Sequence, residues 1–163
     1  MNHLKHYTAI ATELKQSKPE KFELLNEEIN IIIHKLKFIS IENRPMVEIV
    51  DLSQPNADPS LIEELTEIAG AQNNPLIKES ENTDILIFIN DSSSFFSSLP
   101  DLLNDRYRDY KAVRDNNVFI IQKHDFAKHK EDYLLETEIL AEIIQSKYFY
   151  YGHEGNHWIK FGL

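Results

Sequence analysis

Two histidine-containing segments have residue types that could bind a metal or a ligand. The first, His153–Glu154–Gly155–Asn156–His157, matches the HExxH pattern, in which two histidines one helical turn apart hold zinc and the glutamate acts as base. That chemistry requires a helix and a third protein ligand, but Gly152 and Gly155 interrupt the segment and only six residues, Trp158 to Leu163, follow it. We therefore expect surface or packing histidines here, with a zinc hydrolase as the alternative.

The second segment places His124, Asp125 and His129 in a loop that follows a predicted strand. Loops at the carboxyl ends of parallel strands are where α/β sheets gather their ligands. Ligand contact is one interpretation of this cluster. The other is a solvated loop with ordinary titrating histidines, because the spacing fits no particular metal geometry.

Several other site chemistries lack the residues that they need. The serines 92–94, 97 and 98 have no GxSxG motif around them, so a strained nucleophile turn is not indicated. With only four glycines, the chain contains neither GxGxxG nor GxxxxGK, which excludes nucleotide binding of those kinds. The absence of cysteine excludes disulfides, thiol catalysis and cysteine-ligated zinc.

Composition limits the kinds of fold, partner and cellular location that the chain can have. The chain has 163 residues, 42% apolar and 27% charged, which is enough to build one hydrophobic core. A formal charge of −10 disfavours a nucleic-acid partner. The apolar runs, such as residues 85–89, are far shorter than the roughly 20 residues of a membrane-spanning helix. Residues 1–13 lack an export signal, so we expect a chain that starts mature or stays in the cytoplasm.

Helical and strand patterns alternate along the chain. Apolar spacing predicts a short helix from Leu4 and a longer one over Glu20 to Lys37, with a break at residues 17–20. Three β-rich runs predict strands at residues 46–50, 85–89 and 118–121. Further helices are predicted at residues 61–69, 99–113 and 131–146, and an extended aromatic tail at 148–163. Gly70 is predicted as a helix C-cap.

This order predicts an α/β fold with a small parallel sheet flanked by helices, a single Rossmann-like lobe preceded by a long backbone-type helix. We expect three parts: a helical segment at residues 1–43, the lobe at residues 44–149 and the aromatic tail at residues 150–163.

Four segments follow one another in an order that is typical of one family. They are Arg44–Val50, Leu65–Asn73, Asn82–Phe88 and Tyr110–Phe119, and the helix over residues 131–146 completes the series. Together they resemble the C-terminal lobe of helical-backbone (class III) substrate-binding proteins of ABC importers, which carry iron-siderophores, haem, cobalamin or metal ions. The resemblance covers residues 20–149 and includes only one of the family's two lobes, together with the helix that joins them.

The resemblance implies a binding protein without catalytic residues, cofactor or resident metal, and a periplasmic or cell-envelope location. Its ligand would be a small metal chelate, and its partners an ABC permease or a missing partner lobe. By position, the strand-end loops would supply the ligand contacts: Ser53, Gln54, Asn56, Asp91, Ser92, Ser93, Phe95, His124, Asp125 and His129. Glu79 or Glu81 is the nearest candidate for docking onto the permease.

A one-sided site cannot enclose a small ligand, so tight capture would need a partner lobe, a dimer or a large ligand. The alternative is a protein-interaction module that keeps the lobe fold without ligand binding and uses the aromatic tail, Tyr148 to Phe161, as its contact surface.

Overall fold

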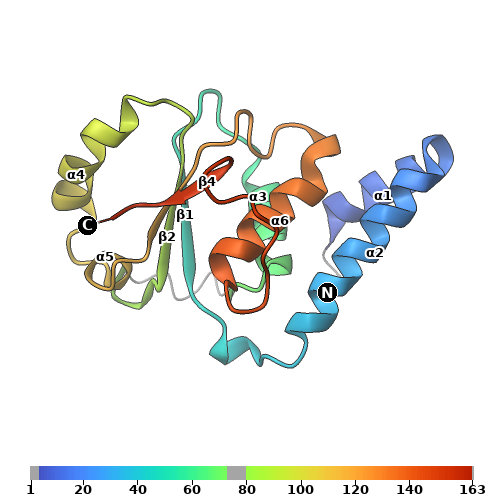
Figure 1. Cartoon of the computed structure of the whole chain (residues 1–163), viewed down its shortest axis with the longest axis horizontal. Helices are drawn as coiled ribbons and strands as arrows, with labels where there is room; N and C mark the ends of the chain where they lie inside the picture. Colours follow the sequence, from blue (N-terminus) through green and yellow to red (C-terminus); the bar gives the residue numbers. More distant parts are fainter. Residues whose placement is uncertain (1–3, 73–79, 163) are drawn as a thin grey trace.

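A computed structural model describes residues 4–72 and 80–162 of the chain. Its centre is a four-stranded sheet in the order β1-β2-β3-β4 (Figure 1). The strands β1 (Val47–Asp51), β2 (Ile85–Ile89) and β3 (Val118–Ile121) run parallel to one another. The predicted α/β class with a mostly parallel sheet is therefore confirmed.

The C-terminal tail adds one strand that the sequence pattern did not predict. β4 (Trp158–Lys160) pairs antiparallel with β3, with Ile120 opposite Ile159. The sheet is therefore mixed rather than purely parallel. The tail reaches this position because it folds back after the last helix, and Trp158 packs into the core.

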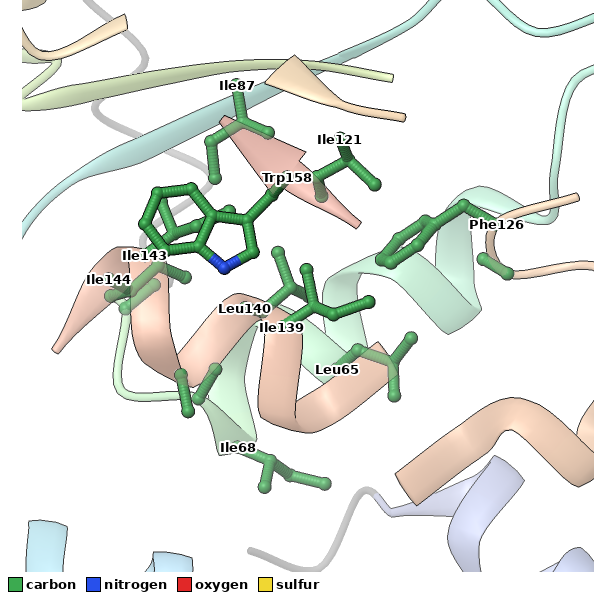
Figure 2. Close-up of a cluster of buried hydrophobic side chains, with 14 of the residues drawn as sticks. Leu65, Ile68, Ile87, Ile121, Phe126, Ile139, Leu140, Ile143, Ile144 and Trp158 are labelled. Atoms are coloured by element: carbon green, nitrogen blue, oxygen red, sulfur yellow. The ribbon is translucent and has the colours of Figure 1, made fainter. Parts of the chain in front are cut away.

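Helices cover both faces of the sheet, and the alternation of side chains along β2 explains why all five of its residues are buried. Ile85, Ile87 and Ile89 face the larger core, which is shared with α2 (Pro19–Leu36), α3 (Pro59–Ile68) and α6 (Tyr133–Ile144). Leu86 and Phe88 face a smaller core with α4 (Phe95–Arg106) and α5 (Lys111–Arg114). Figure 2 shows the larger core, with Trp158 between the sheet and the α6 residues Ile143 and Ile144.

The N-terminal segment forms two helices, α1 (Lys5–Ser17) and α2 (Pro19–Leu36), and the predicted break is confirmed. Lys18 separates them, and Pro19 begins α2 at a position where a missing backbone N–H costs nothing. α2 buries one face against the larger core through Leu25, Ile29, Ile32 and Leu36.

α1 is held at its first turn by a carboxylate from another helix. Glu64 of α3, which is buried, accepts hydrogen bonds from the backbone N–H of His6 and of Tyr7, both at 2.9 Å. It also accepts one from the hydroxyl of Tyr133 at 2.7 Å. A carboxylate at the positive end of a helix satisfies N–H groups that have no partner within that helix.

Two predicted elements need correction. The helix expected over residues 99–113 is two helices, α4 (Phe95–Arg106) and α5 (Lys111–Arg114), so the serines 97 and 98 are helical rather than part of a loop. The break occurs where the rings of Tyr107 and Tyr110 pack together, with Tyr107 also against Phe88. The helix predicted over 131–146 is α6 preceded by a 3-10 turn, η3 (Lys130–Asp132).

α3 matches its sequence signals at both ends. The carboxylate of Asp58 accepts a hydrogen bond from the backbone N–H of Ser60, as an N-cap does, and Gly70 follows the helix with a positive φ of 101°. None of the helices in the described part of the chain is long and apolar enough to cross a membrane.

Candidate functional site

The loops that follow the three parallel strands meet at one edge of the sheet, at the top of Figure 1. The backbone N–H of Leu52 donates to the carbonyl of Ile89, and that of Asn90 donates to the carbonyl of Ile121, both at 3.0 Å. These bonds place the loops 52–58, 90–94 and 122–129 next to one another in the same order as their strands. We call this region the strand-end edge.

Four of the candidate ligand residues form one connected polar cluster on the strand-end edge. Nδ1 of His124 lies 2.6 Å from Oδ2 of Asp91, which joins the loop after β3 to the loop after β2. Oδ2 of Asp125 lies 3.3 Å from Nε2 of His124 and 3.3 Å from Nε2 of His129. We call Asp91, His124, Asp125 and His129 the His–Asp cluster.

The backbone conformation of the loop at residues 122–129 leaves the His–Asp cluster exposed. Asp125 and Ala127 both adopt positive φ, at 53° and 61°, which turns the chain sharply between the two histidines. The His124 side chain is 80% exposed, and the other three side chains are also accessible to solvent. The cluster is therefore a surface feature that a ligand can reach directly.

The charged side chains of the His–Asp cluster shift one another's pKa values. The hydrogen bond to Asp91, followed by the nearby charge of Asp125, raises the pKa of His124. The same hydrogen bond from His124 lowers the pKa of Asp91. Because both ring nitrogens of His124 lie near carboxylate oxygens, this arrangement favours the imidazolium form.

The side chains of the His–Asp cluster contact one another in pairs. Within residues 4–72 and 80–162, no three His, Asp or Glu side chains are grouped so that they could hold a metal ion. The cluster is suited instead to binding polar or charged groups by hydrogen bonds.

A buried network of charged side chains holds the loop at residues 122–129 in place. Nζ of Lys123 lies 3.0 Å from Oδ2 of Asp132 and 3.2 Å from Oε2 of Glu136, and the same Glu136 oxygen accepts from the backbone N–H of Ala127 at 2.6 Å. Burial raises the pKa of Glu136 to about 7 despite these donors. Sequence analysis missed this network. Its signal is a glutamate at position 136 that falls, with Thr137 and Glu142, within the largely apolar buried face of α6.

The loop after β1 uses its polar residues mainly to hold its own shape. The carboxylate of Asp51 accepts from the backbone N–H of Ser53 at 2.9 Å and from that of Ala57 at 2.7 Å. The side-chain amide of Asn56 donates to the carbonyls of Asp51 and Ser53. Gln54 is exposed. Asn56 and Asp51 also line a cavity of about 490 Å³ between β1 and α3.

The remaining candidates of the β2 loop differ in their accessibility. Ser92 and Ser93 are exposed beside Asp91, and the hydroxyl of Ser92 bonds to that of Ser94 at 2.8 Å. Phe95 is only 6% exposed, and its ring lies 5.7 Å from that of Phe88 in the smaller core. The structure thus keeps the Phe95 ring away from the surface of the strand-end edge.

Of the two candidates for docking onto a permease, the structure describes one. Glu79 falls outside the described residues. Glu81 is exposed in a 3-10 turn, η2 (Ser80–Asn82), which precedes β2. That position is at the opposite end of the sheet from the His–Asp cluster.

The HExxH segment folds as a turn. The backbone N–H of His157 donates to the carbonyl of His153 at 2.9 Å, and the two rings lie 5.6 Å apart. Nε2 of His153 lies 3.0 Å from Oε1 of Glu138, whereas Glu154 is exposed. These residues therefore do not form the helical arrangement that a zinc hydrolase uses.

The backbone on either side of this turn is tied to a single carboxylate. Glu142, which is buried, accepts hydrogen bonds from the N–H groups of Tyr151, Gly152 and His153 and from the indole of Trp158. The tail is thus an integral part of the lobe. Tyr148 and Tyr150 are its exposed large side chains.

No family model matches this chain, and no curated protein matches it.

Proposed function

We propose that the protein is a non-enzymatic ligand-binding protein, a single-lobe relative of the substrate-binding proteins of ABC importers. Its ligand would be a metal chelate of the iron-siderophore, haem or cobalamin type rather than a bare metal ion, because no three His, Asp or Glu side chains in the described residues are grouped to hold one. The observation that supports this proposal most strongly is the hydrogen bond between Asp91 and His124, because it unites two strand-end loops into one accessible polar cluster.

The charges at this edge indicate how a ligand would be held. The His124 imidazolium, His129 and the neighbouring Lys128 supply donors, while Asp91 and Asp125 supply acceptors. A carboxylate on the periphery of a chelate can replace Asp91 or Asp125 as the partner of an imidazolium. Recognition would therefore act on the outer groups of the chelate and leave its metal fully coordinated.

The exposure of the cluster also limits the affinity. Small-ligand sites usually bury 70–90% or more of the ligand surface, and an open edge covers only one side. We therefore expect modest affinity from the lobe alone, and tighter capture when a second protein surface closes over the ligand.

A thermal-shift screen with ferric siderophores, haem, cobalamin and divalent metals tests the proposal, because a ligand that binds only the folded state raises the melting temperature. The combined variant His124→Ala, Asp125→Ala and His129→Ala should abolish the shift while the domain stays folded. His34→Ala, which removes an exposed imidazole on α2, is the control and should keep the shift. A shift that survives the combined variant would contradict a site at the strand-end edge. Silence across the panel would instead favour the interaction-module alternative.

A further inference from the structure

α2 exposes apolar side chains beside its buried face. Leu24, Ile31 and Phe38 are 54%, 39% and 80% exposed, and they recur every seven residues. Residues seven apart lie on the same side of a helix, so the three form one line about 21 Å long. Phe38 lies just beyond the end of α2, and its ring packs edge-on against that of His34. We call Leu24, Ile31 and Phe38 the α2 stripe.

A helix that is apolar on both faces normally has both faces covered. One face of α2 packs against the larger core through Leu25, Ile29, Ile32 and Leu36. No described part of the chain covers the α2 stripe in this way, and the net charge of the chain is −10. Exposed apolar side chains aligned in this way are typical of an interaction surface.

The charges beside the stripe divide along the helix. The first half of α2 contains four acidic residues and one basic residue, Lys21, whereas its last turn and the residue after it are basic: Glu20, Glu23, Glu27 and Glu28 on one side, and His34, Lys35 and Lys37 on the other. Glu27 lies four residues before Ile31, and Lys35 lies four residues after it, so both flank the centre of the stripe.

We propose that the α2 stripe is the contact between two copies of this chain, whose α2 helices pack antiparallel across a two-fold axis beside Ile31. In this arrangement Ile31 meets Ile31, Leu24 meets Phe38 of the other copy, and Glu27 meets Lys35 of the other copy. Each of the last two contacts occurs twice, as in any two-fold interface.

The separation of acidic and basic residues along α2 favours a second copy of this chain as the partner that covers the α2 stripe. Antiparallel packing places the acidic half of each helix against the basic half of the other, which is favourable at both ends. Parallel packing would place Glu27 against Glu27, which is unfavourable. Glu27 and Lys35 are both exposed, and within the described residues Lys35 contacts only the ring face of Phe149, at 5.3 Å, so both are available.

This interface is independent of the proposed ligand site, because it uses α2 and leaves the strand-end edge uncovered. It would join two binding lobes in one particle.

Sedimentation velocity and light scattering over a range of protein concentrations test the proposal directly. The wild-type chain should reach twice its 19.1 kDa mass as concentration rises. Ile31→Asp should remain at 19.1 kDa with an unchanged circular dichroism spectrum. Phe38→Ser provides the same test if Ile31→Asp perturbs folding. Tyr150→Asp, which alters the most exposed aromatic of the tail, should dimerise like the wild type.

Charge reversal tests the antiparallel geometry. Glu27→Lys and Lys35→Glu should each weaken the dimer about tenfold, because each converts two attractive contacts into repulsive ones. An equimolar mixture of the two single variants should regain the wild-type affinity through heterodimers, in which both contacts are again attractive. A wild-type chain that stays monomeric at every concentration would overturn the proposal. So would a dimer that Ile31→Asp leaves intact, or a mixture that recovers nothing.

Discussion

Replacing Glu142 with glutamine should detach the C-terminal tail from the lobe. The carboxylate accepts four hydrogen bonds, from the backbone N–H groups of Tyr151 at 2.7 Å, Gly152 at 2.9 Å and His153 at 3.1 Å, and from the indole N–H of Trp158 at 3.0 Å. A glutamine offers one acceptor oxygen, and it turns an NH₂ group toward two N–H donors that it cannot satisfy.

The expected loss of stability follows from these contacts. A hydrogen bond to a charged group contributes about 1.5–3 kcal/mol to stability, so the sum over the four bonds is an upper bound on the loss. The loss is limited because the tail can undock and let water satisfy its donors. We therefore expect a loss of about 2–4 kcal/mol in the free energy of unfolding, which is typical when a buried hydrogen-bond network is broken.

The chain has one tryptophan, Trp158, so its fluorescence reports on the tail alone. Glu142→Gln should shift the Trp158 emission to longer wavelength in native buffer and lower the urea midpoint. Glu138→Gln, one helical turn earlier and bonded to a single side chain, His153, is the matched control and should change little. Wild-type emission together with an unchanged midpoint in Glu142→Gln would refute the role given to this carboxylate.

The same site predicts a pH dependence. Burial of Glu142 opposes its ionisation, but the hydrogen bonds from Trp158 and the backbone outweigh burial and lower its pKa. A carboxyl group with a lowered pKa stabilises the fold above its unfolded value, near 4.3, and this contribution disappears as the pH falls through the folded value. Acid should therefore release the tail in the wild type, seen as the same red shift of Trp158.

Three further predictions concern the cluster, its support and a glycine. In Asp91→Asn, the pKa of His124 should fall toward 6.5, measured by NMR titration of the imidazole protons, whereas an unchanged value would show that the Asp91 contact is absent in solution. Glu136, with a pKa of about 7, binds a proton in the folded state that the unfolded chain releases near pH 4.3, so wild-type stability should fall by up to about 3 kcal/mol from pH 5 to pH 8. Glu136→Gln should remove this fall in urea unfolding, and equal slopes in both proteins would contradict it. Gly70→Ala should cost about 1–3 kcal/mol, because φ is 101° and a Cβ would lie 2.7 Å from Cγ of Gln145. Gly152→Ala, at φ 84° with nothing within 4 Å, should cost less in the same unfolding assay, and an equal cost would show that the contact with Gln145 is unimportant.

The parallel strands and the helices with clear caps could be predicted from sequence because their signals are local. The continuous apolar run of β2 and the Asp58 and Gly70 caps of α3 are each contained in a few neighbouring residues. The split between α4 and α5 could not be predicted in this way, because it depends on the packing of the Tyr107 ring against those of Phe88 and Tyr110.

The tail shows a second limit of sequence analysis. β4 has three residues, and the segment before it is held by Glu142, on another element, which accepts from the N–H groups of residues 151–153. Glu64 and Glu136 act in the same way on α1 and on the loop after β3. In each case an acidic residue that looks solvated in the sequence is buried by tertiary contacts.

The proximity of the strand-end loops could be predicted from the sequence. Parallel strands bring their carboxyl ends to one edge, so the neighbourhood of His124 and Asp91 follows from strand order. The contacts within that edge, and the burial of Phe95 in the smaller core, depend on the conformation of the loops. That conformation requires positive φ at Asp125 and Ala127, for which neither residue type gives a strong signal.

The central claim is that the strand-end edge binds a ligand, and NMR mapping with the ligand selected by the thermal-shift screen tests it most directly. We predict that saturating ligand shifts the imidazole signals of His124 and His129 and the amide signals of the loops at residues 90–94 and 122–129. The signal of His34, which lies on α2, should stay in place. Shifts that cluster on other elements and leave His124 and His129 unchanged would contradict the claim.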